Sequence, residues 1–187
     1  MTVDSRSDGD LIEACNHAGP EAAANAFGAL YRRHRSYVLR VARRFTDDHD
    51  VAADVLQETF IYLLRQFPPT GKGLKLTARL TTFLYPIAKN FAISALRKAE
   101  RFEAAAEAPE DLPDPAPASA DHDAIERALA HLSSERREVL ILRFVDDMTL
   151  KEIAAVLQIP LGTVKSRLHF ALGALRENPK IKDLFEP

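Results

Sequence analysis

The chain has 187 residues, of which 47% are hydrophobic and 28% are charged, and its formal net charge is -2. This balance is typical of a chain that folds into one ordinary globular domain or two small ones. The apolar runs are only a few residues long, against the roughly 18 that a membrane-spanning helix needs, and the first ten residues lack the apolar stretch of a signal peptide. We therefore predict a cytoplasmic protein with no membrane insertion.

The cysteine content excludes an internal disulfide, because Cys15 is the only cysteine of the chain. No second cysteine lies nearby to suggest a zinc site. Two interpretations of Cys15 remain, a packed thiol and a redox sensor, and we favour the packed thiol.

Charge is divided unevenly along the chain, which the small net value hides. Residues 31–102 hold 14 Lys and Arg against 6 Asp and Glu, whereas residues 103–126 hold 8 acidic residues and no basic one. Within 103–123 there are also four prolines and only one large aliphatic residue. Such a segment cannot bury enough apolar surface to offset the entropy of ordering it, so we predict a flexible acidic linker there. The chain then divides into domains at 1–102 and 124–187.

Both domains are predicted to be all-α, since apolar residues recur at three- and four-residue spacing and no stretch alternates apolar with polar residues. Proline and glycine pairs and polar clusters separate the helices. In the first domain we expect helices at about 8–17, through 27–45, through 55–67 and over about 77–100.

The last of these four helices is predicted to have an apolar side and a basic side. The apolar side is expected to carry Leu80, Leu84, Ile87, Phe91 and Leu96. The other side offers cations for backbone phosphates and an amide that can hold an unpaired base, which suits melted DNA. Its residues are Arg79, Lys89, Asn90, Arg97 and Lys98.

The second domain is also predicted to be helical throughout. Apolar residues mark a helix through 125–132, and Ser133 is a suitable N-cap for the next helix. Thr149 and Glu152 have the spacing of a capping box, so a further helix is expected to begin there. The final helix is expected to begin near residues 162–163.

Residues 149–176 are predicted to form a helix-turn-helix. Ala154 is expected where the two helices cross, because a larger side chain would push them apart. Gln158 stands in the turn, where glycine would be easier for the backbone. Exposed polar side chains early in the final helix could reach base edges in a major groove. These are Thr163, Lys165, Ser166, Arg167 and His169. The alternative is an αα-hairpin packed in a bundle.

Four segments of the chain resemble the sigma-70 family. Residues 132–176, which include TLKEIAAVLQIPLGTVKSRL, closely resemble region 4, which reads the minus-thirty-five promoter element. Response regulators of two-component systems also end in a helix-turn-helix of this kind. LYRRHRSYVLRVARRF (30–45), DVLQETFIYLLR (54–65) and FLYPIAKNFAISALRK (83–98) resemble, in that order, the helices of region 2. Together they resemble the extracytoplasmic-function (ECF) group, which keeps only these two domains.

The resemblance implies a sigma factor that joins core RNA polymerase and directs promoter-specific initiation for a stress or envelope-signal regulon. Asp54, Gln57 and Glu58 would dock on the clamp of the β′ subunit, and region 4 would meet the flap of the β subunit. Without the resemblance, Asp54 and Glu58 would be interpreted as a solvated helix face. The helix over 83–98 would bind the minus-ten element through Phe83, Lys89, Asn90, Arg97 and Lys98. Phe83 fits a core position equally well on pattern alone.

The resemblance also implies partners beyond polymerase and promoter DNA. Family members are commonly held inactive by an anti-sigma factor that covers both DNA-binding domains, so we expect such a partner. The acidic linker would either thread into the polymerase channel where RNA passes or act only as a spacer.

Three positions depart from the family pattern. Phe83 stands where tryptophan is common, and Ser94 replaces a frequent acidic residue. Phe170, Gly173 and Ala174 occupy a helix face that is often basic, which lowers the phosphate-binding charge of the second domain.

Two other classes of function were weighed against a sigma factor. A sigma mimic would use the same fold to sequester an anti-sigma factor without binding DNA. The basic side over 79–101 argues against it, as does the segment before Tyr31, which is too short for a receiver domain. A DNA-acting enzyme is disfavoured because the sequence holds no carboxylate cluster, metal-ligand spacing or nucleophile motif, so we expect no catalytic residue, metal or cofactor.

Overall fold

The computed structural model describes residues 4–103 and 132–177, and all regular structure within these two ranges is helical. The all-α prediction is therefore confirmed. The chain divides into two compact units, residues 1–109 and 110–187. The predicted linker at 103–123 lies outside the described residues, except for Glu103 at the end of a helix.

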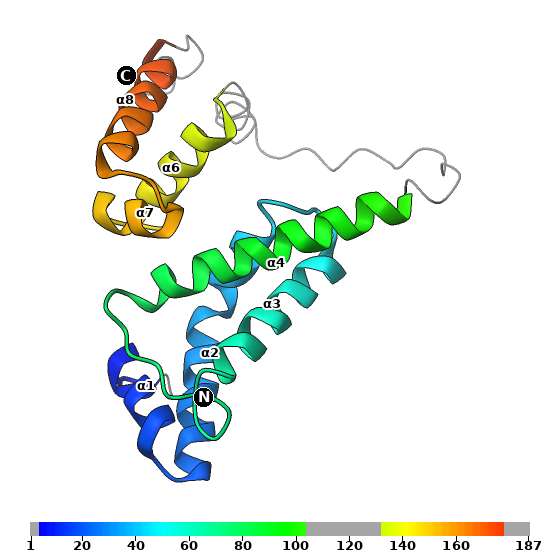
Figure 1. Ribbon diagram of the computed structural model, residues 1–187, viewed down its shortest axis with the longest axis vertical. Helices are drawn as coiled ribbons and strands as arrows, with labels where there is room; N and C mark the ends of the chain where they lie inside the picture. Colours follow the sequence, from blue (N-terminus) through cyan, green and yellow to red (C-terminus); the bar gives the residue numbers. More distant parts are fainter. Residues whose placement is uncertain (1–3, 104–131, 178–187) are drawn as a thin grey trace. The chain divides into compact units, whose positions relative to one another are not determined.

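The described part of the first unit consists of helices joined by short turns and one longer loop (Figure 1). They are α1 (Asp8–His17), α2 (Pro20–Ala42), α3 (His49–Leu64) and α4 (Leu80–Glu103). Ser7 and Asp10 form a capping box at the start of α1, and the Asp48 side chain accepts hydrogen bonds from two backbone N–H groups at the start of α3. These caps satisfy backbone donors that have no partner within a helix.

Three helices have other bounds than the predicted ones. The helix predicted through 55–67 ends at Leu64, so Phe67 lies in the turn that follows. The helix predicted through 27–45 begins seven residues earlier, at Pro20, because proline at the first helical position has a suitable φ and needs no hydrogen-bond donor. It also ends at Ala42, so Phe45 lies in the turn that follows. The predicted helix over 77–100 runs instead from Leu80 to Glu103.

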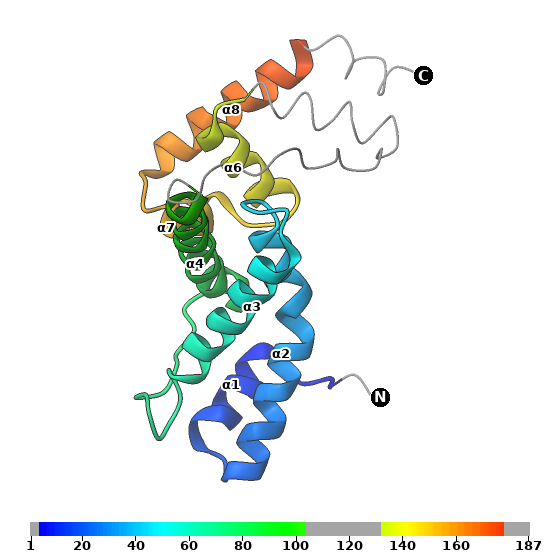
Figure 2. The same ribbon diagram turned by 90° about the vertical axis from the view of Figure 1, so that its right-hand side faces the viewer.

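α2 is the central helix of this unit and packs against α1, α3 and α4, while α3 also packs against α4 (Figure 2). Aromatic rings join α2 to α3: Tyr31 and Phe60 meet edge to face at 4.8 Å between centroids, and Phe27 meets Phe60 at 6.3 Å. Such pairs add to the stabilisation from burial alone. The core is formed by Leu11, Leu30, Val38, Val41, Leu63, Leu80, Leu84 and Tyr85.

The loop between α3 and α4 is held by α1. The Asn16 amide donates to the carbonyl of Leu74 at 2.8 Å and accepts from its N–H at 2.9 Å. Gly73 beside it has a φ of 91°, and an added Cβ would lie 2.9 Å from the Asn16 Oδ1. Glycine is thus required here by both the backbone and the side-chain contact. The loop therefore delivers the chain to the start of α4 along a defined path.

The predicted apolar side of α4 is partly wrong. Leu80 and Leu84 are fully buried, but Ile87 and Phe91 are only half-buried, and Leu96 is 39% exposed. Every described side chain from Leu96 to Arg101 is exposed, because this end of the helix runs on past α3 (Figure 1). In place of these three residues, the core takes Tyr85, Ala88 and Ala92.

The described part of the second unit contains α6 (Ser134–Phe144), α7 (Leu150–Leu157) and α8 (Leu161–Glu177). α8 packs against both α6 and α7. The helix predicted through 125–132 lies outside the described residues, except for buried Leu132. The core of this unit is formed by Val139, Leu142, Met148, Ile153, Val164 and Ala171.

The predicted N-caps of α6 and α7 are confirmed at the expected residues. The Thr149 hydroxyl accepts from the N–H of Glu152 at 3.2 Å, and the Glu152 carboxylate accepts from the N–H of Thr149 at 2.8 Å, which completes the capping box. Ser133 is the N-cap of α6, although its side chain forms no capping hydrogen bond. α8 begins at Leu161, slightly earlier than predicted.

Among residues 4–103 and 132–177, no helix has the length and apolar character that crossing a bilayer requires.

Candidate nucleic-acid interface

α7, a tight turn and α8 form the predicted helix-turn-helix in the second unit. Ile153 on α7 and Val164 on α8 are fully buried between them. The Ile159 N–H donates to the carbonyl of Ala154 at 3.1 Å and ends α7. Gln158 has φ 54° and ψ 41°, a left-handed conformation that turns the chain into α8. A non-glycine residue is uncommon there, so the packing on both sides must hold it.

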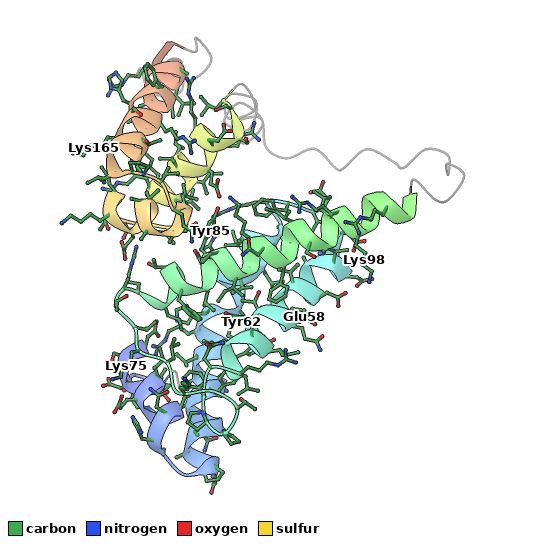
Figure 3. All side chains as sticks on the ribbon, in the orientation of Figure 1. Glu58, Tyr62, Lys75, Tyr85, Lys98 and Lys165 are labelled. Carbon is green, nitrogen blue, oxygen red and sulfur yellow. The ribbon has the colours of Figure 1, made fainter. Side chains whose placement is uncertain are left out.

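α8 carries the residues predicted to meet the minus-thirty-five element, and three of them, Lys165, Ser166 and His169, face away from the buried side of the helix. Lys165, Ser166 and His169 are exposed, and Thr163 and Arg167 are half-buried. Figure 3 shows Lys165 projecting from this helix. The Ser166 hydroxyl donates to the carbonyl of Thr163 at 3.0 Å, one turn earlier. Lys165, Ser166 and His169 therefore share the solvent face of α8, and Thr163 and Arg167 lie at its edge, nearer the buried side.

α4 brings together most of the residues predicted for the minus-ten element. Phe83, Asn90 and Arg97 are seven residues apart, so they share one face of the helix, and Lys98 lies about 100° around the helix from Arg97, at one edge of this face. Asn90, Arg97 and Lys98 are exposed, while Phe83 is half-buried. Lys89 is half-buried and lies about 100° around the helix from Asn90, so it belongs to the flank of this face.

Two apolar residues that the sequence pattern assigns to the core lie on and beside this face of α4. Ile87 and Phe91 follow Phe83 at four-residue spacing and are half-buried. This four-residue spacing from Phe83 is the feature of the sequence that could have predicted their position. A half-exposed aromatic and aliphatic row beside Asn90 offers stacking surface for unpaired bases.

α3 presents the three residues predicted to bind polymerase. Asp54, Gln57 and Glu58 are all exposed, and their spacing places them on one face. Tyr62 lies one turn beyond Glu58 and is 43% exposed, and Figure 3 shows both residues on α3. Tyr62 was not singled out from the sequence, although its four-residue spacing from Glu58 was visible there. Tyrosine is enriched at protein-binding surfaces, so Tyr62 is a candidate contact beside the three predicted residues.

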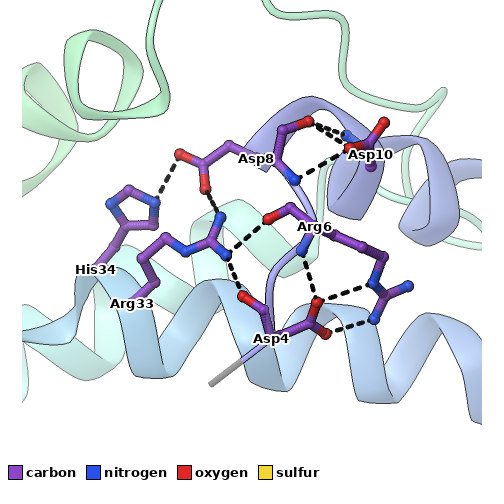
Figure 4. Close-up of polar contacts among 7 residues, drawn as sticks. Asp4, Arg6, Asp8, Asp10, Arg33 and His34 are labelled. Atoms are coloured by element: carbon purple, nitrogen blue, oxygen red, sulfur yellow. Dashed lines mark hydrogen bonds and ion pairs between the residues drawn. The ribbon is translucent and has the colours of Figure 1, made fainter. Parts of the chain in front are cut away.

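A polar network ties the N-terminal segment to α2 (Figure 4). Arg33 donates to the Asp8 carboxylate at 2.6 Å, and the His34 Nε2 lies 2.8 Å from the other oxygen of Asp8. Burial acts to raise the pKa of Asp8, but the hydrogen bonds from Arg33 and His34 outweigh it, and the pKa is lowered. Arg33 also donates to the backbone carbonyls of Asp4 and Arg6. This network fixes α1 on α2, beside the start of α4.

Family models match both units. The model for sigma-70 region 2 matches residues 30–102, which contain most of α2 and all of α3 and nearly all of α4. The model for sigma-70 region 4 matches residues 122–175, which contain α6, α7 and most of α8. Together the two matches span well over half of the chain.

The chain belongs to the ECF group of the sigma-70 family.

Relatives with curated names are similar over most of this sigma factor. The ECF RNA polymerase sigma factor SigL of Mycobacterium tuberculosis is 37% identical over 164 residues, which cover 83% of this chain and 89% of SigL. RpoE of Cereibacter sphaeroides is 30% identical over 87% of this chain and 89% of its own, and SigW of Bacillus subtilis is 27% identical over 86% and 91%.

Solved structures share the fold of this sigma factor. RpoE of Bartonella quintana, solved with the anti-sigma factor NepR, has a TM-score of 0.60 and 23% identity and covers 86% of this chain and 98% of its own. CnrH, solved with the cytosolic domain of CnrY, has a TM-score of 0.61 and 23% identity, with 95% and 96% covered. The two-domain helical architecture is therefore one that solved sigma factors also have.

As a member of this family, the chain is a transcription initiation factor. Sigma factors as a family are not enzymes. Among residues 4–103 and 132–177, no group of three His, Cys, Asp or Glu side chains is placed to hold a metal ion. Cys15 is 6% exposed, and burial raises the pKa of its thiol. The predicted packing of this thiol is therefore confirmed, and a raised pKa lowers the fraction of reactive thiolate.

Proposed function

We propose that this sigma factor binds core RNA polymerase and directs it to promoters by two separate DNA contacts. The observation that carries the proposal is the polar surface of α8, with exposed Lys165 and Ser166 and half-buried Arg167, in a chain that both sigma-70 region models match. A helix fills a major groove and presents such side chains to base edges and phosphates. Region 4 would thus read the minus-thirty-five element.

Region 2 supplies the second DNA contact in this proposal. Asn90, Arg97 and Lys98 of α4 would meet the minus-ten element, with Lys89 at the flank. The two cations at the end of the helix can bind backbone phosphates, and the Asn90 amide can hydrogen-bond an unpaired base. Phe83 and the half-exposed row that follows it provide the stacking surface.

The polymerase contact is assigned to α3. Asp54, Gln57 and Glu58 would dock on the clamp of the β′ subunit, with Tyr62 adding apolar area at the edge. Acidic residues around an exposed tyrosine give both a charge match for a basic partner surface and a fixed anchor. The flap of the β subunit would bind region 4.

Control by an anti-sigma factor is the third part of the proposal. RpoE of Bartonella quintana and CnrH were each solved with a protein partner, NepR for the first and the cytosolic domain of CnrY for the second. The present chain would be held in the same way, with a protein covering its DNA-binding faces, and released in the cytoplasm by a stress or envelope signal.

The acidic segment at 103–123 would act as the linker between domains 1–102 and 124–187.

The decisive experiment is reconstitution with core RNA polymerase, followed by mapping of transcript starts on genomic DNA. On a promoter found in this way, Lys165→Ala with Arg167→Ala should reduce run-off transcription at least tenfold, because two contacts worth about 1 kcal/mol or more each are lost. The variant should still co-purify with polymerase, since α8 is not part of the α3 surface.

The matched control removes the same charge from region 2. Arg32 and Arg35 are exposed on α2, and their replacement by alanine should leave binding to the upstream element unchanged. Unchanged run-off transcription by the Lys165 and Arg167 variant would refute the role of α8. A wild-type chain that binds an anti-sigma factor but yields no transcripts would favour the sigma mimic instead.

A further inference from the structure

Phe170 places an aromatic ring on the surface of α8, where it is 56% exposed. The guanidinium of Arg136, which belongs to α6, lies over this ring with its central carbon 5.2 Å from the ring centroid. The His169 ring meets Phe170 edge to face, with centroids 5.7 Å apart. A guanidinium stacked on a ring keeps its N–H donors in the plane, free to point outward. Phe170 thus serves as a platform for a cation from another helix.

Packing between α6 and α8 sets the position of this pair. Leu140, one turn after Arg136, is buried in one cluster with Leu132 and Ala171. Ala171 is the residue next to Phe170 on α8. The two helices are therefore fixed against each other at the point where Arg136 crosses to Phe170, so the stack does not depend on the surface contact alone.

Arg136 and Arg167 both act electrostatically on Glu135, which lies at the start of α6. The pKa of Glu135 is lowered by its own backbone N–H, by the Ser133 hydroxyl and by the charges of Arg167 and Arg136. Glu135 is thus an exposed carboxylate on which both guanidinium groups act, although they come from different helices.

We propose that Arg136, held on Phe170, binds a backbone phosphate of promoter DNA beside the groove that α8 enters. This rests on the proposed role of region 4 as reader of the upstream element. Arg167 and Phe170 are three residues apart, so they share the flank of α8 that faces α6. A helix about 10–12 Å across fills a groove about 12 Å wide, so its flanks face the phosphate walls.

The proposal gives a physical role to an apolar residue on a face that is often basic in the family. Phe170 carries no charge itself, but it holds the guanidinium of Arg136 close to where a basic side chain at position 170 would place its charge. The phosphate contact is thereby supplied by α6 rather than by α8. A phosphate contact adds affinity at every sequence and orients the helix that reads the bases.

The test measures DNA binding by the full chain assembled with core RNA polymerase, using a fluorescent duplex that carries the upstream element of a mapped promoter. Arg136→Ala should lower the magnitude of the slope of log affinity against log salt by about one, the value for one lost phosphate contact. Phe170→Ala should weaken binding roughly two- to fivefold, since the cation remains but loses its platform. A neutral methylphosphonate at the contacted phosphate should weaken the wild type and leave Arg136→Ala unaffected.

Two variants separate a phosphate contact from a structural effect. Arg136→Ala combined with Phe170→Arg returns the charge to α8 and should restore the salt slope. Phe144, 58% exposed in the same unit, is the matched control, and Phe144→Ala should leave DNA binding unchanged.

The outcomes distinguish this inference from the proposed function. If Lys165→Ala with Arg167→Ala abolishes binding but Arg136→Ala keeps the wild-type salt slope, the phosphate contact is wrong and the role of region 4 stands. If the wild-type assembly does not bind the upstream duplex at all, both the proposed function and the phosphate contact are overturned.

Discussion

Asp8 illustrates how one side chain can secure the N-terminal helix. Its carboxylate binds Arg33 and His34 of α2, and it lies in the first turn of α1, where a negative charge is favourable. The lowered pKa of Asp8 means that the folded protein prefers the ionised carboxylate. The carboxylate therefore stabilises the fold above the unfolded pKa of 3.8, and this stabilisation is lost as the pH falls through the lowered folded value.

Asp8→Asn tests this at the scale of one residue. The variant should be destabilised by about 1 kcal/mol at pH 7, since two hydrogen bonds to a charged acceptor are weakened at a partly exposed site. The difference in urea midpoint should shrink below about pH 4, where the wild-type carboxylate also becomes protonated. Asp47→Asn, at an exposed position, is the control and should unfold like the wild type. A gap that stays constant down to pH 2 would contradict this account.

Glu58 is the residue on α3 whose proposed role is easiest to isolate. It is exposed, so Glu58→Lys should leave the fold intact and change only the surface charge. We expect capture of core polymerase to weaken about tenfold, because reversal turns an attractive contact into a repulsive one. Glu21→Lys makes the same change at an exposed position in the first turn of α2 and should have no effect. Co-purification of the Glu58 variant at the wild-type level would remove α3 from the polymerase interface.

At the scale of elements, the capping box of α7 controls the start of the helix-turn-helix. α7 has only eight residues, too few to be stable without its caps and its packing on α8. Its two ends are both held by named residues, Thr149 with Glu152 at the start and Gln158 at the end.

Thr149→Ala should destabilise this element by about 1 kcal/mol, the usual effect of losing an N-cap side chain. Hydrogen exchange of the amides in α7 should then become roughly fivefold faster, while the amides of α3 stay protected as before. Thr149→Ser keeps the hydroxyl and should exchange like the wild type. Equal protection of α7 in all three proteins would mean that packing alone defines its start.

α4 shows how an element can serve the core and a surface at once. Its first half is buried on one side by Leu80, Leu84 and Tyr85, while Phe83 and Asn90 look away from that core. Pro86 lies inside the helix, where it removes one backbone donor. The helix continues nonetheless, because its buried side is packed against α2 and α3.

At the scale of the whole molecule, the two units are expected to act as separate modules. Each has a core of its own, and the family models match them one by one. Domains of this kind generally fold alone. We therefore expect polymerase binding and reading of the upstream element to reside in different units, which can be tested by expressing each unit alone.

Expressed separately, residues 1–109 should co-purify with core polymerase, and residues 110–187 should bind the upstream duplex with the salt dependence of the full chain. Neither fragment should support transcription, because initiation needs both functions in one molecule. Circular dichroism checks that each fragment is helical; a fragment that is unfolded by itself would contradict the modular account.

In the full chain, a neutral linker of equal length should change the yield of abortive products only if the acidic segment enters the RNA channel.

Local chemistry explains why the elements could be predicted from the sequence. The capping box at Thr149, the breaks near Gly19 and after Phe144, and the three- and four-residue spacing all act within one or two helical turns. The exposure of Lys165, Ser166 and Glu58 follows in the same way, since a polar residue opposite an apolar stripe faces water. The all-α class, the helix-turn-helix and the family resemblance were therefore readable without a structure.

Contacts between distant segments decided the rest. Leu96 was assigned to the core but is exposed, because α4 runs on past the start of α3 (Figure 1), which the local pattern does not reveal. The Asn16 contact with Leu74 and the Arg136 stack on Phe170 join residues 58 and 34 positions apart. The sequence alone thus determined which helices form and which of their faces are polar. Only the packing of one helix on another decided which apolar residues stay exposed and where a cation is held for DNA.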